Sequence, residues 1–179
     1  AEISWSIIDE LMGQNPQLGF PEYFWIMGAL FFMAGFAYFT VYTYKKYQAS
    51  KKSIITLVLV TLVSAAIVTY LIGNFIVGFQ EGESVFEIFL DYYYPVTSAI
   101  ILILSISVYS FYKELEELGK PLLFLALSTV VGFIADMLYT YWSWNDIYGV
   151  PGLISDSLYG IDYILSAAAF YLLFRLAKK

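Results

Sequence analysis

The chain has 179 residues, of which 60% are hydrophobic, 20% are aromatic and only 13% are charged. A soluble domain of this length cannot bury so much apolar surface, so the composition predicts a polytopic membrane protein. The chain has no cysteine and no histidine, which excludes disulfides, thiolate nucleophiles, histidine-ligated haem and serine–histidine catalysis. Its net charge of −6 argues against nucleic acid as a partner, because that affinity depends on cationic side chains.

The first twenty residues predict an element at the membrane surface. Apolar residues recur at helical spacing between Ile3 and Leu11, with acidic residues on the other side of the helix. A linker rich in Gly, Asn and Pro follows. We expect residues 1–20 to form a short interfacial amphipathic helix and linker, and residues 21–179 to form a five-helix transmembrane domain.

Five apolar runs follow the linker, and each is long enough to cross a hydrocarbon core of about 30 Å. They cover residues 23–44, 54–79, 88–112, 121–144 and 157–176. Within the fourth run, Asp136 is the single acidic or basic residue between Leu122 and Trp142. The segment 145–156 before the last run contains Pro151 and Gly152 and predicts a turn.

The basic residues predict the orientation of the five spans. All nine fall in segments on one side of the membrane: Lys45, Lys46, Lys51, Lys52, Lys113, Lys120, Arg175, Lys178 and Lys179. By the positive-inside rule this side is cytoplasmic. The sequence therefore predicts an all-α, multi-pass protein of the cell membrane, with its N-terminus outside and its C-terminus in the cytoplasm.

Small and hydroxylated residues predict which helix faces meet protein rather than lipid. Gly28 and Gly35 mark such a face on the first span. The fourth span carries a stripe with a repeat of four residues, made of Ser128, Gly132, Asp136 and Thr140.

Three aspartates, Asp91, Asp136 and Asp162, enter the spans from the predicted outer side. The spans contain no lysine or arginine at that level, so each carboxyl must be protonated, hydrogen-bonded, hydrated or bound to a cation. We predict a polar cluster or cation site made of Asp91, Tyr94, Asp136, Tyr139, Asp162 and Tyr163. The alternatives are carboxyls that only fix the packing of three helices, a hydrated vestibule, and a catalytic role.

From about residue 54 to 174, the chain resembles the multi-span sensory modules of archaeal histidine kinases and bacterial diguanylate cyclases. Those modules carry Tyr-Pro-x-x-Asp at the head of one span, Ala-Asp-x-x-aromatic late in the next, and a further Asp and Tyr in the last. The matching residues are Tyr94-Pro95, Ala135-Asp136 with Tyr139, and Asp162-Tyr163. At the position of the first motif's aspartate the chain has Ser98. The resemblance implies a membrane sensor that passes a signal to a cytoplasmic domain.

These patterns leave three functional hypotheses. The leading one is a non-catalytic accessory or structural subunit of a larger membrane complex, in contact with lipid and with other integral membrane subunits. The second is a sensory module without its output domain, which is either a fragment or acts through a separate partner. The third is a small cation or proton pathway through the aspartates. We expect no enzymatic activity, cofactor or bound metal.

Overall fold

The computed structural model describes residue 7 and residues 19–46, 51–76, 84–113, 116–144 and 149–178. Regular elements in these ranges are all helical: α2 (Phe20–Lys46), α3 (Lys51–Leu71), the π-helical turn η2 (Ile72–Ile76), α4 (Val85–Tyr112), α5 (Glu116–Trp144) and α6 (Val150–Ala177). Five helices in this described part are long and apolar enough to span a membrane. The predicted all-α class with five candidate spans is confirmed. Residues 1–6 and 8–18, which include most of the predicted interfacial helix, lie outside the described residues.

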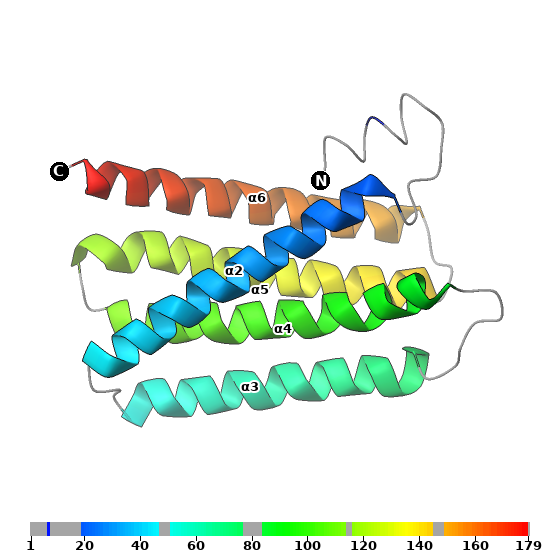
Figure 1. Ribbon diagram of the computed structural model, residues 1–179, viewed down its shortest axis with the longest axis horizontal. Helices are drawn as coiled ribbons and strands as arrows, with labels where there is room; N and C mark the ends of the chain where they lie inside the picture. Colours follow the sequence, from blue (N-terminus) through cyan, green and yellow to red (C-terminus); the bar gives the residue numbers. More distant parts are fainter. Residues whose placement is uncertain are drawn as a thin grey trace.

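The five helices form an up-and-down bundle with chemically different ends (Figure 1). We call the end where α2, α4 and α6 begin the acidic end, because Glu22, Glu87 and Asp156 lie there. We call the opposite end the basic end, because the described basic residues lie there, accompanied by Glu116 and Glu117. The separation of positive charge that the sequence predicts is therefore preserved in the fold.

Helices α4 and α5 form the centre of the bundle. Helix α6 packs against α5, whereas α2 and α3 pack mainly against α4. Helix α2 runs obliquely across the bundle (Figure 1) and meets α6 through an edge-to-face contact of Phe32 with Phe170. Large apolar side chains on α2, α3 and α6 are widely exposed, as expected for helices that face lipid or other proteins.

Two apolar clusters fill the bundle. The first joins α3, α4 and α5 and contains Val68, Leu71, Ala99, Leu102, Phe133 and Met137. The second lies nearer the basic end, joins α2, α4, α5 and α6, and contains Phe36, Val108, Tyr112, Leu125 and Ala169. Val108 and Ala169 are 1% and 0% exposed, so helices pack closely at this level.

Two boundaries have clear local causes. Helix α4 begins with a capping box, in which the Ser84 hydroxyl accepts from the Glu87 amide and the Glu87 carboxylate accepts from the Ser84 amide. Helix α6 begins at Val150, so the predicted turn over residues 145–156 is wrong in its second half. Pro151 sits in the first turn of α6, where its missing amide breaks no helical bond, and Gly149 precedes it with a φ of 88°.

The prediction that Gly28 and Gly35 mark a protein-facing side of the first span is also wrong. A Cβ atom built on Gly28 or Gly35 meets nothing within 4 Å, so these residues do not mark a protein-facing side among the described residues. A Cβ on Gly132 of α5 would lie 2.8 Å from Oδ2 of Asp162 on α6. The prediction for the stripe on the fourth span is therefore confirmed at Gly132.

Candidate functional site

Asp136 is the residue through which three helices meet. Its Oδ2 atom accepts a hydrogen bond from the Ser98 hydroxyl of α4, and its Oδ1 atom accepts one from the Tyr159 hydroxyl of α6 at 2.6 Å. Next to Asp136, the small side chain of Ala135 lets the helices approach closely, and Ala135 is 0% exposed. This close approach brings Asp136 within reach of α4 and α6. Both carboxyl oxygens thus have hydroxyl donors from different helices.

Asp162 forms a second junction nearer the basic end, between α5 and α6. It accepts a hydrogen bond from the Ser128 hydroxyl of α5, and Ser128 also shares a 2.6 Å hydrogen bond with Ser166 of α6. Gly132 lies against the Asp162 carboxyl, where any larger residue would crowd it. Gly132, which contacts the Asp162 carboxyl, lies about one helical turn from Asp136 on α5, so the two carboxyl groups are neighbours along the α5–α6 interface. We call the set Ser98, Ser128, Asp136, Tyr159, Asp162 and Ser166 the aspartate seam.

A third carboxyl lies nearer the acidic end. The Tyr94 hydroxyl of α4 donates to Glu22 of α2, and the Tyr93 hydroxyl donates to the Ile26 carbonyl at 3.0 Å. Tyr94 also lies within electrostatic range of Asp136. Tyr94 therefore connects the beginning of α2 to the seam.

The predicted cluster is only partly assembled. Asp136 and Asp162 belong to the seam, and Tyr94 lies beside it. Asp91 precedes Ser98 by seven residues, a rise of about 10 Å along the helix, and so lies closer to the acidic end. Tyr139 and Tyr163 are 54% and 46% exposed, and their side chains lie largely on the outer surface of the bundle.

Sequence reasoning placed Ser98 on the polar, protein-facing side of the third span and Tyr159 on that of the fifth, and it named Tyr159 as a candidate donor to the aspartates. It did not pair either residue with Asp136 in particular. Glu22 lies before the first predicted apolar run and gave no signal of a partner on α4. The spacing of Ser128, Gly132 and Asp136 was informative, because a repeat of four residues places all three on one side of a helix.

The hydrogen bonds to the buried aspartates end near the middle of the predicted span, and nearer the basic end the Ser53 hydroxyl of α3 donates to the Ser110 carbonyl of α4. Ser105 of α4 and Thr129 of α5 share a hydrogen bond, and Thr129 is at the centre of the span Glu117–Trp142. One turn further toward the basic end, Leu125 belongs to the second apolar cluster. In the described part of the chain, the aspartate seam therefore extends from the acidic half of the bundle to its middle, where Ser128 and Ser166 lie.

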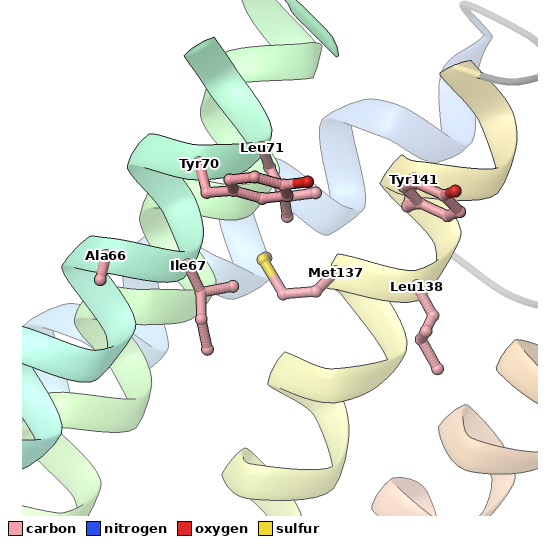
Figure 2. A pocket seen from close by; sticks show the side chains of 7 residues that line it. All are labelled: Ala66, Ile67, Tyr70, Leu71, Met137, Leu138 and Tyr141. Atoms are coloured by element: carbon pink, nitrogen blue, oxygen red, sulfur yellow. The ribbon is translucent and has the colours of Figure 1, made fainter. Parts of the chain in front are cut away.

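The opposite side of α5 carries an apolar groove of about 410 Å³ against α3 (Figure 2). It is lined by Ala66, Ile67, Tyr70, Leu71, Met137, Leu138 and Tyr141. Figure 2 shows Met137 pointing from α5 toward α3, with the rings of Tyr70 and Tyr141 on either side of the groove. Helix α5 thus presents the Asp136 carboxyl to α4 and α6 and apolar side chains to α3.

The chemistry available at the seam is hydrogen bonding and proton exchange. Within the described ranges, no group of three or more acidic side chains is placed to hold a metal ion. The basic residues of the described spans lie at the basic end, so none is at the level of the seam carboxyls to balance a carboxylate. Serine and tyrosine hydroxyls are both donors and acceptors, so they can adjust to either protonation state of a neighbouring carboxyl.

No protein-family model matches the chain, and comparisons with curated proteins and with solved structures gave no match either.

Proposed function

We propose that the chain is a membrane sensory module that responds to a stimulus at its acidic end and passes a signal to a partner or domain at its basic end. The observation that carries this proposal is the junction of Ser98, Asp136 and Tyr159. In this proposal the acidic end faces the outside of the cell and the basic end faces the cytoplasm, in line with the positive-inside rule.

The convergence of separate sequence motifs supports the sensory function. The resemblance rests on short motifs in three different spans, and residues of all three motif regions lie at the aspartate seam. Ser98 occupies the place of the first motif's aspartate, Asp136 belongs to the second motif, and Asp162 lies in the last span.

Capture of the intact protein from its native membranes tests this proposal. Extraction in mild detergent followed by native mass spectrometry should recover a partner with a cytoplasmic kinase or cyclase domain. The Asp136→Asn variant should keep that partner but alter its catalytic output, whereas Glu87→Gln, at the surface of α4, should not. Recovery of the chain alone, or an Asp136→Asn variant with unchanged output, would contradict the sensory function.

The accessory-subunit hypothesis is the second candidate, and α2 favours it. This helix packs mainly against α4 and exposes a series of large aromatic side chains: Tyr23, Phe24, Phe31, Tyr38 and Phe39. Such a surface suits contact with other membrane subunits as well as with lipid. In the capture experiment, stoichiometric recovery of a multi-subunit membrane enzyme would favour this function over the sensory one.

A cation or proton pathway across the membrane has less support. Such a pathway needs polar groups or water along its whole length. Beyond Thr129, the described interior is filled by the second apolar cluster around Leu125 and Ala169. We therefore propose no transport function.

A further inference from the structure

Helix α6 is attached to the bundle in two chemically different ways. From the acidic half to just past its midpoint, α6 binds α5 through hydroxyl–carboxyl and hydroxyl–hydroxyl contacts of Tyr159, Asp162 and Ser166. In the basic half, α6 is held by apolar packing around the fully buried Ala169. The interface of α6 with α5 is the most extensive between any two helices in the described part of the chain, and most α6 side chains outside it are partly or fully exposed.

We propose that the aspartate seam is a proton-operated latch, in which the number of protons on Asp136 and Asp162 sets how closely the acidic half of α6 docks on α5. The apolar contact at Ala169 serves as the pivot. This inference deepens the proposed sensory function and rests on it for its biological meaning, but the movement is a property of the chain alone.

The charges around the seam determine the direction of the movement. Asp136 is faced by Tyr94 from α4 and by Tyr159 and Asp162 from α6, and Tyr139 is nearby on its own helix. Asp162 is faced from α5 by Asp136 and by the uncharged Ser128 and Gly132. Glu22 adds a further carboxyl through Tyr94. The seam therefore has two carboxyl groups, a third from Glu22 nearby, and no cationic side chain.

Two ionised carboxylates on facing helices repel each other more strongly in an apolar interior than in water. A proton on either carboxylate removes that repulsion. The protonated carboxyl can then donate a hydrogen bond from its OH group to a neighbouring serine or tyrosine oxygen. We therefore expect the acidic half of α6 to dock closely at low pH and to move away at high pH. The close contact of Gly132 with Asp162 makes this interface sensitive to small displacements.

Spin-label distance measurements on the full chain in lipid nanodiscs test the latch. The chain has no native cysteine, so labels attach only at introduced sites. A pair at the acidic end joins Phe89→Cys of α4 to Leu153→Cys of α6, and both native side chains are exposed. A pair at the basic end joins Leu123→Cys of α5 to Phe174→Cys of α6, which are also exposed.

Between about pH 4 and pH 8, where carboxyl groups titrate, the distance at the acidic end should lengthen by about 2 Å while that at the basic end stays constant. The double variant Asp136→Asn with Asp162→Asn should abolish the change, and Glu87→Gln should retain it. An unchanged acidic-end distance, an equal change at both ends, or the same change in the double variant would overturn the latch. The wild-type titration remains decisive if the double variant does not fold. Failure of the latch would leave the partner experiment unaffected, so the two proposals fail separately.

Discussion

The Tyr159 hydroxyl of α6 lies 2.6 Å from Oδ1 of Asp136 on α5. This hydrogen bond joins two consecutive helices that run in opposite directions. Ser98 of α4 binds the other oxygen of the same carboxyl. A single acidic side chain therefore fixes the relative position of three helices. This arrangement leads to the predictions below.

The contact of Ser98 with Asp136 should appear as an energetic coupling. We expect Ser98→Ala and Asp136→Asn each to destabilise the fold, and the two losses to be non-additive by about 0.5–1.5 kcal/mol, the range found for hydrogen bonds between membrane helices. Equilibrium unfolding of the wild type, both single variants and the double variant measures this coupling. Strictly additive losses would contradict the contact.

Because Gly132 packs closely on Asp162, an alanine substitution should lower the stability of the protein at Gly132 but not at Gly28. Gly132→Ala should destabilise the protein by about 1–2 kcal/mol, because Asp162 must turn away and lose its bond from Ser128. Gly28→Ala is the matched control, because its Cβ meets nothing within 4 Å. Thermal unfolding should show the control unchanged or slightly stabilised, and equal effects at both positions would refute the packing.

The contact of Ser98 with Asp136 predicts that the stability of a Ser98→Asp variant depends on pH. Ser98→Asp places a second carboxyl against Asp136, and two carboxylates in contact cannot both remain ionised at low energetic cost. We expect this variant to approach wild-type stability near pH 5 and to lose stability by about pH 8, as the shared proton is removed. Ser98→Asn, which adds similar bulk without the charge, should show no such dependence. A pH-independent Ser98→Asp variant would disprove the close approach.

The separation of basic and acidic ends predicts which residues are accessible from each side of the membrane. In intact cells, Val85→Cys at the start of α4 should react with a membrane-impermeant thiol reagent, because Val85 is 85% exposed and lies at the acidic end. Lys51→Cys at the start of α3 should react only after the cells are opened. The reverse pattern would invert the proposed orientation.

The helices themselves were predictable because long apolar runs without charge have few stable alternatives to a spanning helix. Asp136 and Asp162 were predictable as buried polar residues, because the spans lack any cation to pair with them. The repeat through Gly132 gave the correct face of α5 because it follows the helical period.

The partners of the carboxyls were less predictable, because they depend on the rotation of each helix about its own axis. Tyr139 precedes the predicted outer segment 145–156 and Tyr159 follows it, yet Tyr159 donates to Asp136 whereas Tyr139 is 54% exposed. The early start of α6 was missed because proline and glycine are typical both of turns and of the first turn of a helix.

The hydrogen-bonding state of the Asp136 carboxyl is the most direct test of the central claim that this group joins α4 and α6 to α5. Isotope-edited infrared spectra, with Asp136→Asn used to assign its band, would be compared for the wild type, Ser98→Ala and Tyr159→Phe. We predict that each variant shifts the Asp136 band and that the double variant shifts it further. A band that stays in place in both single variants would show that Asp136 does not join these helices, and the sensory proposal would lose its basis.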